Sequence, residues 1–270
     1  MLRTRVITAL VMLVVFATAL FAFPARGWML FVAVITACAG WEWGGLCHWR
    51  SALRIGYGIG LAALAALLCG LVPGVGGSEP FYRLAFIVSA LFWLLIGFAW
   101  LARRWTLGQG ARAALAGAVV LVPTAMAMVS LRQEDPWWLL GAMAIVWMAD
   151  IAAYFSGRAF GRRKLAPAIS PGKSWEGVYG ALVGVVLYGL VTLVLAGVRL
   201  APGGWALVVV GLLVLTGVSV AGDLLESLLK RQAGIKDSSQ LLPGHGGVLD
   251  RIDSLTSTLP MVALFALLAH

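Results

Sequence analysis

Long hydrophobic stretches, separated by short polar segments, run along almost the whole chain. They are rich in Leu, Ala, Val and Gly and lack the regular alternation of a membrane-spanning strand. A helix needs about 20 residues to cross a hydrocarbon core of about 30 Å. The pattern therefore predicts nine membrane-spanning helices, over about residues 6–23, 28–47, 55–72, 84–102, 113–131, 137–156, 176–197, 205–222 and 254–269.

The composition supports the same fold class. Hydrophobic residues make up 61% of the 270 positions and charged residues only 11%, whereas soluble domains are about half apolar and about a quarter charged. A soluble domain is therefore excluded, and we expect an all-α, polytopic integral membrane protein. We divide it into N-terminal transmembrane helices over residues 1–136 and C-terminal transmembrane helices with polar loops over residues 137–270, within a single membrane unit.

The basic residues indicate an orientation. With the N-terminus inside the cell, all but four of the 20 Lys and Arg residues lie in predicted inner segments, the exceptions being Arg26, Arg83, Arg132 and Arg199. Basic residues tend to stay on the cytoplasmic side. We therefore expect a cytoplasmic N-terminus, an external C-terminus, and cytoplasmic loops after the sixth and eighth spans. The net charge of +9 could suggest a nucleic-acid partner. The basic segments lack the interleaved aromatic residues of a nucleic-acid surface, however, so no such partner is expected.

Several tryptophans lie near predicted span ends, where an amphipathic indole suits the membrane interface. Small residues are frequent within the spans and permit close helix packing. We expect the following tryptophans to be interfacial anchors: Trp28, Trp105, Trp137, Trp138, Trp175 and Trp205.

The acidic residues are concentrated near the inner ends of the later spans. An ionisable side chain there is costly unless it pairs, binds a cation or reaches water, so it is a candidate functional residue. Seven of the 11 acidic residues form this group: Asp150, Glu176, Asp223, Glu226, Asp237, Asp250 and Asp253.

The segment over residues 222–253 combines two carboxylate pairs with glycines and basic residues. Asp223 and Glu226 are three apart on a helix that continues the eighth span, so they share a face, and Asp250 and Asp253 repeat this spacing. Gly-rich backbone can turn N–H groups toward an anion, and oxygen ligands favour a hard cation such as Mg²⁺. The segment therefore predicts a site for metal-bound phosphates, with basic contacts from Lys230, Arg231, Lys236 and Arg251.

A second candidate segment, SPGKSWEG at residues 170–177, follows the sixth span. Lys173 and the hydroxyls of Ser170 and Ser174 suit a phosphate, although the segment is not a Walker A motif. Asp150 and Tyr154, four apart near the inner end of the sixth span, are expected to face the same pocket.

Structural roles compete with these functional ones. For Asp223 and Asp250 we favour contact with metal or substrate over an ion pair. The partner in such a pair would be Lys230, Arg231 or Arg251. Glu226 and Asp253 suit either the site itself or hydrogen-bonding partners of its ligands.

Other polar residues have more local alternatives. A loop role and a substrate contact are equally expected for His245. Glu42, between Trp41 and Trp43 at the inner end of the second span, favours an internal ion pair or a helix cap. Four basic residues are expected to fix the membrane orientation and to attract anionic lipid: Arg158, Arg162, Arg163 and Lys164.

These motifs resemble the signature of the phosphatidate cytidylyltransferase (CDP-diacylglycerol synthase) family. The family pattern S-x-x-K-R-x4-K-D is met by Ser227, Lys230, Arg231, Lys236 and Asp237. Its ending H-G-G-x-x-D-R-x-D is met by His245, Gly246, Gly247, Asp250, Arg251 and Asp253. Upstream, SPGKSWEG and GRAFGRRKLAP resemble the family's SPGKTWEG and GR-x-x-G-x-x-K-L-x-P. The likeness is detailed over residues 149–253, and the N-terminal half matches only as hydrophobic helices.

Two positions depart from the family pattern A-D-T-G-A-Y. Ile151 and Ala152 stand where the family usually has Thr and Gly, while Asp150 and Tyr154 on either side are kept. A hydroxyl and a glycine are lost, so no role is assigned to these two positions.

The resemblance implies transfer of a cytidylyl group from CTP to phosphatidic acid, giving CDP-diacylglycerol and pyrophosphate. It implies Mg²⁺ held by Asp223 and Asp250, with room for a second cation. The catalytic residues would be Asp223, Asp250, Lys230, Arg231 and Arg251. The substrate-binding residues would be Asp150, Tyr154, Ser170, Lys173, Ser174, Ser227, Lys236, Asp237, His245, Gly246 and Gly247. The expected partners are CTP, phosphatidic acid, membrane lipid and a second copy of the chain, in a bacterial inner membrane.

Two other functions fit part of the pattern. Another CTP-dependent lipid enzyme, an archaeol cytidylyltransferase or a polyprenol kinase, would share the spans and the carboxylates. A secondary transporter would place broken helices from two repeats near the middle of the membrane. The acids here lie near the inner ends of the spans, which favours an enzyme.

Overall fold

The computed structural model describes residues 2–71 and 79–269, and within them nine helices are long and apolar enough to cross a membrane. Each predicted span overlaps one of these helices, which confirms the all-α membrane architecture; residue 72, the predicted end of the third span, lies outside the described residues. The helices are α1 (Leu2–Ala22), α2 (Ala25–Leu46), α3 (Ser51–Leu68), α4 (Glu79–Leu91) continued by the π-helix η1 (Phe92–Gly97) and α5 (Phe98–Arg103), α6 (Ala111–Glu134), α7 (Pro136–Phe160), α8 (Trp175–Leu195), α9 (Pro202–Gln232) and α10 (Leu249–Ala269).

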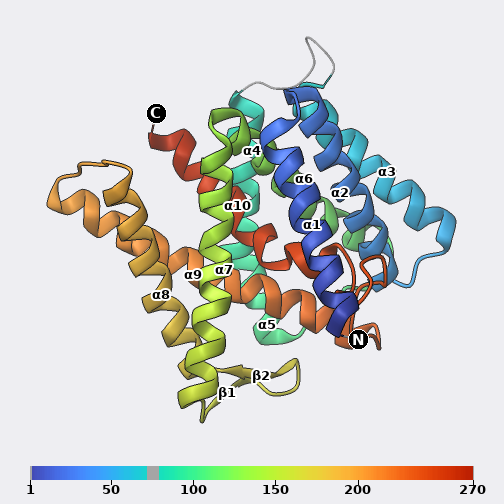
Figure 1. The fold of residues 1–270 in the computed structure, drawn as a ribbon. Helices are drawn as coiled ribbons and strands as arrows, with labels where there is room; N and C mark the ends of the chain where they lie inside the picture. Colours follow the sequence, from blue (N-terminus) through green and yellow to red (C-terminus); the bar gives the residue numbers. More distant parts are fainter. Residues whose placement is uncertain (1, 72–78, 270) are drawn as a thin grey trace.

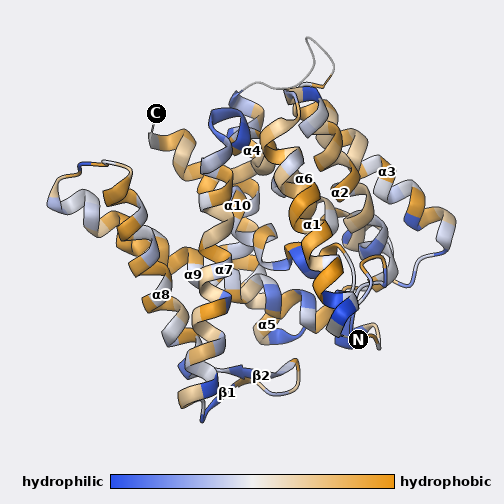
Figure 2. Cartoon of the chain, in the orientation of Figure 1, coloured by the Kyte–Doolittle hydropathy of each residue, from blue (hydrophilic) through white to orange (hydrophobic). Residues whose placement is uncertain are grey.

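The two ends of the bundle differ in polarity. Figure 1 shows the N-terminus, the α9–α10 loop and a small hairpin at one end and the C-terminus at the other. Figure 2 shows hydrophilic residues gathered around the first of these ends, below helices that are largely hydrophobic along their length. The motif-bearing segments therefore share one end of the bundle with the N-terminus.

The segment after α7 differs from the predicted loop. It contains two short antiparallel strands, β1 (Lys164–Ala166) and β2 (Ser170–Ser174). Their pairing sets Lys164 opposite Ser174 and Ala166 opposite Ser170, with an irregularity between the two pairs. The hairpin fixes where the SPGKS segment lies relative to the helices.

Local side-chain chemistry defines the start of the two helices that flank the hairpin. Asp135 accepts a hydrogen bond from the N–H of Trp137 (2.7 Å), and Pro136 occupies the first turn of α7. Ser174 caps α8 by accepting from the N–H of Gly177 (3.2 Å). Both residues satisfy N–H groups that have no acceptor within their own helix.

Helix α6 lies in the middle of the core, with 72% of its most apolar stretch buried inside the protein. Trp28 of α2 is fully buried, and its Nε1 donates to the carbonyl of Met128 in α6 (3.1 Å). The prediction of an interfacial anchor was therefore wrong for Trp28, because a neighbouring helix covers the ring and accepts from its N–H. Trp137 and Trp138 are more than half exposed at the start of α7, as an interfacial position requires.

A proline in α10 leaves one backbone carbonyl inside the bundle without its helical hydrogen-bond donor. Pro260 has no N–H, so the carbonyl of Thr256, four residues earlier, loses its helical donor. A side chain from another helix replaces that donor, because Trp93 Nε1 of η1 donates to this carbonyl oxygen at 3.1 Å. Thr124 Oγ1 of α6 lies 3.4 Å from the same oxygen, but its one proton is donated to the carbonyl of Val120 in its own helix at 2.7 Å. An unpaired backbone carbonyl is costly where water is absent, so the hydrogen bond from Trp93 holds α10 against η1.

Trp93→Phe is therefore expected to lower stability by about 1–3 kcal/mol, because the Thr256 carbonyl loses its best donor while the ring's apolar contacts are largely kept. Thermal unfolding in detergent measures the effect. Trp138→Phe is the matched control, because Trp138 is more than half exposed. Equal melting temperatures for the two variants would contradict this account of the proline.

Helices α7 and α8 approach closely through small residues. A Cβ on Gly184 would lie 2.6 Å from the Cβ of Ala152, and a Cβ on Gly180 would overlap the side chain of Ser156. Glycines on α8 thus make room for the side chains of α7. Ala152, one of the two departures from the family pattern, fits because Gly184 lies opposite it, and Ile151 is half exposed on the outside of the helix pair.

Candidate active site

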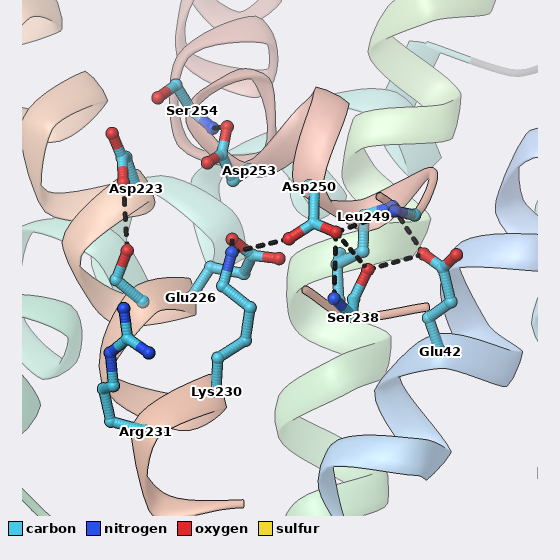
Figure 3. A network of polar contacts seen from close by, with 12 residues as sticks. Glu42, Asp223, Glu226, Lys230, Arg231, Ser238, Leu249, Asp250, Asp253 and Ser254 are labelled. Carbon is cyan, nitrogen blue, oxygen red and sulfur yellow. Dashed lines mark hydrogen bonds and ion pairs between the residues drawn. The ribbon is translucent and has the colours of Figure 1, made fainter. Parts of the chain in front are cut away.

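The site lies at the polar end of the bundle, where α9, the start of α10 and the loop between them meet (Figures 1 and 3). The hairpin reaches α9 through an ion pair. Helix α9 continues to Gln232, beyond the predicted end of the eighth span at residue 222. Its last turns therefore carry Asp223, Glu226 and Lys230 on a continuous helix. Asp250 lies in the first turn of α10.

Lys230 joins the two helices. Its Nζ lies 2.6 Å from Glu226 Oε2 on α9 and 2.6 Å from Asp250 Oδ1 on α10. The side chains of Glu226 and Asp250 are almost fully buried, and that of Lys230 is 13% exposed. The spacing of Glu226 and Lys230 on one helix face makes their pairing local, whereas Asp250 adds a contact between helices. Asp250 thus forms an ion pair with Lys230, one of the three partners named for the structural alternative, and its contact with metal or substrate stays a prediction.

The second oxygen of Asp250 is held by the α9–α10 loop. Asp250 Oδ2 accepts from the N–H of Ser238 (2.9 Å), the hydroxyl of Ser238 (2.9 Å) and the N–H of Gly247 (2.7 Å). The loop turns through Gly244 and Gly246, whose φ angles of +78° and +82° suit glycine. The glycine-rich loop does direct an N–H group to an anion, as expected, and that anion is the protein's own carboxylate.

A second carboxylate orders the same loop from α2. Glu42 is fully buried and accepts from the N–H groups of Val248 (3.0 Å) and Leu249 (2.6 Å), at the start of α10. The hydroxyl of Ser239 also donates to it, at 2.6 Å. The interpretation of Glu42 as a helix cap is confirmed, although the helix that it caps follows it by about 200 positions.

Asp223 connects α9 to the hairpin. Its carboxylate forms an ion pair with Lys173 of β2 and accepts from the hydroxyl of Ser227 (3.3 Å). Arg231 makes a second connection, because its Nε lies 3.4 Å from the carbonyl oxygen of Ile169. The two motif segments, separated in sequence, are thus brought together by one ion pair and one hydrogen bond.

Two further acids lie near Asp223. Asp150 on α7 is close enough to Asp223, Lys173 and Arg251 for their charges to interact, and Asp253 on α10 is close to both Asp223 and Asp150. Asp253 Oδ1 accepts from the N–H of Ser254 (2.7 Å). Figure 3 shows Asp253 between Asp223 on one side and Asp250 on the other. Three helices thus direct carboxylates toward one region.

The donor set fits a hard cation in part. In residues 2–71 and 79–269, no three acidic, His or Cys side chains are placed together as a preformed metal site. Mg²⁺ is usually held by one or two carboxylates together with substrate phosphates, so a preformed cluster is not required. Within the described part of the chain, Asp223 has two polar contacts, whereas the oxygens of Asp250 have four, so Asp223 has the greater free capacity to bind a cation.

Other predicted residues occupy the surroundings of these contacts. Tyr154 is 59% exposed, and Arg158 donates to its hydroxyl (3.2 Å). His245 donates its backbone N–H to the carbonyl of Leu242 (2.8 Å), and its buried Nδ1 has no hydrogen-bond partner among the residues that the structure describes. Five further predicted residues are exposed or half-buried near the site: Ser170, Lys236, Asp237, Gly246 and Arg251. Their roles in substrate binding stay predictions.

Sequence reasoning did not identify Ser238 and Ser239. Both serines lie within the family-like segment, directly after Asp237, and both donate to buried carboxylates. The available signal was the presence of two adjacent hydroxyl residues in a loop that also contains acidic residues. Their partners were not evident, because Glu42 belongs to a distant part of the chain.

Comparison with known proteins extends the resemblance to the whole chain. A family profile described as "Cytidylyltransferase family" matches residues 3–269. A phosphatidate cytidylyltransferase of Pseudomonas aeruginosa is 40% identical over 274 residues, covering 97% of this chain and 96% of the relative. The protein of the same name from Haemophilus influenzae is 35% identical over 291 residues, covering 98% of each chain. Another from Brucella suis is 45% identical over 168 residues, covering 61% of this chain and 60% of the relative.

Proposed function

This chain belongs to the cytidylyltransferase family, and from that premise we propose that it transfers the cytidylyl group of CTP to phosphatidic acid. The products are CDP-diacylglycerol and pyrophosphate. Near-complete coverage of relatives named phosphatidate cytidylyltransferase is the observation that carries the proposal. The buried and half-buried charges at one end of a membrane bundle suit a reaction between a water-soluble nucleotide and a lipid.

The reaction exchanges one phosphoanhydride bond for another. An oxygen of the phosphatidic acid phosphate attacks the α-phosphorus of CTP, the bond from that phosphorus to the β-phosphate oxygen breaks, and pyrophosphate leaves with the bonding electrons. A phosphate monoester carries about 1.5–2 negative charges near neutral pH, so the nucleophile needs no strong general base. The protein must therefore position two anionic substrates and offset their charge.

Basic side chains supply part of this charge. We assign phosphate contacts to Lys173, Lys230, Arg231 and Arg251. The first two are held in place by acidic partners, Asp223 for Lys173 and the pair Glu226 and Asp250 for Lys230. Such pairing fixes the position of each ammonium group before substrate binds, which reduces the reorganisation needed during reaction.

We propose that Asp223 and Asp250 also hold Mg²⁺, with Asp223 as the residue of greater free capacity. When bound, the ion would neutralise charge on the transferring and leaving phosphates. Room for a second cation is part of the same proposal, on the side of Asp223 where Asp150 and Asp253 lie. We further propose a homodimer, which size-exclusion chromatography with light scattering in detergent would test.

The substrate assay uses the purified chain with CTP labelled at either the α- or the γ-phosphate. Label from the α-phosphate should enter lipid when phosphatidic acid is supplied, and label from the γ-phosphate should not. Lipid labelling from the γ-phosphate would instead identify a lipid kinase. Transfer to archaeol phosphate or a polyprenol but not to phosphatidic acid would replace the proposed lipid substrate.

We also propose that the site and the N-terminus face the cytoplasm of a bacterial inner membrane. The basic-residue distribution supports this, as does the bacterial origin of the relatives. In a cysteine-free background, Ala168→Cys in the exposed turn of the hairpin should resist an impermeant thiol reagent in intact cells and react once the cells are opened. Leu200→Cys, in the α8–α9 loop, should react in intact cells. The reverse pattern would invert the topology.

A further inference from the structure

A buried acid in the N-terminal half of the chain, far in sequence from the catalytic motifs, contacts the loop of the candidate site. Glu42 lies on α2 with no exposed surface, and no Lys or Arg pairs with it in the described part of the chain. A buried carboxylate without a basic partner is costly unless hydrogen bonds satisfy it. Its neighbours therefore indicate why it is there.

Among the described residues, all the donors to Glu42 belong to the α9–α10 loop or to the start of α10. Oε1 accepts from the Ser239 hydroxyl (2.6 Å) and the Val248 N–H (3.0 Å). Oε2 accepts from the Leu249 N–H (2.6 Å), with the Ser238 hydroxyl at 3.2 Å. The first N–H groups of a helix lack acceptors of their own, and a negative charge is favourable at that end. Glu42 therefore fixes both the loop and the first turn of α10.

Glu42 and Asp250 hold the same loop from opposite sides (Figure 3). The hydroxyl of Ser238 lies 2.9 Å from Asp250 Oδ2 and 3.2 Å from Glu42 Oε2, and a hydroxyl has one proton to donate. The shorter distance favours donation to Asp250. Gly247 lies between the two acids as well, since a Cβ there would come within 2.7 Å of Glu42 Cδ and would overlap the Ser238 hydroxyl. The loop thus fits tightly between the two carboxylates.

We propose that Glu42 is a positioning residue for cytidylyl transfer, holding the loop over residues 238–249 so that Asp250 and Lys230 keep their places. Glu42 acts only through these neighbours and contacts no reacting group. The inference rests on the proposed function for its kinetic consequences, whereas its effect on the loop is independent of that function.

The test compares Glu42→Gln and Glu42→Asp with Thr36→Val. Gln keeps the size but turns an N–H₂ group toward donors, and Asp keeps the charge on a shorter side chain. Thr36 is a matched control because it is also buried on α2, and among the described residues its hydroxyl bonds only to the carbonyl of Val32 in the same helix (2.8 Å). Yield and melting temperature establish the folded fraction of each variant.

Two readouts separate positioning from general stability. Glu42→Gln should lower kcat per folded molecule by about 10–100-fold with little change in the KM for CTP, since a small misplacement of a reacting group has effects of this size. Glu42→Asp should recover part of kcat. In substrate-free protein, hydrogen exchange at the amides of Ser238, Gly247, Val248 and Leu249 should speed up about 10-fold or more in Glu42→Gln. Thr36→Val should change neither readout.

Several results would overturn the proposal. Normal kcat per folded Glu42→Gln molecule would show a purely structural role, and unchanged exchange in the loop would remove the proposed mechanism. If Glu42→Gln does not fold, Ser239→Ala carries the test, with an expected loss in kcat of about 3–10-fold from one missing donor. Normal kcat in that variant overturns the proposal. Absence of CTP turnover in the wild type would instead contradict the proposed function, and the exchange arm would still test Glu42.

Discussion

Asp223→Asn should lower CTP turnover by at least about 10²-fold while the protein remains folded, the scale for loss of one strong electrostatic contact to a reacting group. The Asp223 side chain is 26% exposed, and its two polar contacts among the described residues are with Lys173 and with the Ser227 hydroxyl. The amide keeps the volume and can still accept from Ser227. It removes the charge that holds Lys173 and that we assign to Mg²⁺.

Turnover is measured with purified protein at several Mg²⁺ concentrations, together with the melting temperature in detergent. Partial recovery at high Mg²⁺ supports a cation ligand, whereas a loss that Mg²⁺ does not relieve supports a role through Lys173 alone. Glu79→Gln is the control, because Glu79 also pairs with a basic residue, Arg83, in an exposed position away from the site. Near-normal turnover of Asp223→Asn at ordinary Mg²⁺ would remove Asp223 from the mechanism.

Asp250→Asn should lower both turnover and stability, in contrast to the same substitution at Asp223. The Asp250 side chain is 4% exposed, and its oxygens have contacts with Lys230, Ser238 and Gly247. An amide places an N–H₂ group among these donors and weakens the pairing of Lys230. Removing one partner of a buried ion pair destabilises a protein by about 3–5 kcal/mol, and we expect about 3 kcal/mol because Lys230 keeps Glu226.

The measurement compares the two asparagine variants under the same conditions. Both should lose turnover by about 10²-fold or more, and only Asp250→Asn should show a clearly lower melting temperature and yield. A stable, inactive Asp250→Asn variant would assign Asp250 to the substrates rather than to the loop. A stable and active one would contradict both of its roles.

The helices could be predicted because the signal for them is local. Long apolar stretches show where the chain crosses the membrane, and the spacing of Asp223, Glu226 and Lys230 places their side chains on one face of α9. The β-hairpin was not predicted, since β2 is a five-residue strand that contains Pro171 and Gly172. Both residues are depleted from strands.

Long-range partners had no local signal. Nothing in the residues around Lys173 indicates that it pairs with Asp223, because the pairing depends on how the hairpin lies against α9. The prediction that Trp28 is an interfacial anchor was wrong for a similar reason, since only the packing of α6 shows that the ring is covered. The resemblance indicated the candidate residues of the site, and the structure adds which of them contact one another.

The long sequence separation between Glu42 and its donors affects the biosynthesis of the protein. Val248 follows Glu42 by 206 positions, and a ribosome adds about 5–20 residues per second. Glu42 is therefore synthesised about 10–40 s before the loop that satisfies it, while α2 is already available for membrane insertion. During that interval the carboxylate needs water, lipid headgroups or an insertion factor as a temporary partner. Truncated nascent chains ending before residue 238 should consequently be held at the insertion machinery longer in the wild type than in Glu42→Leu.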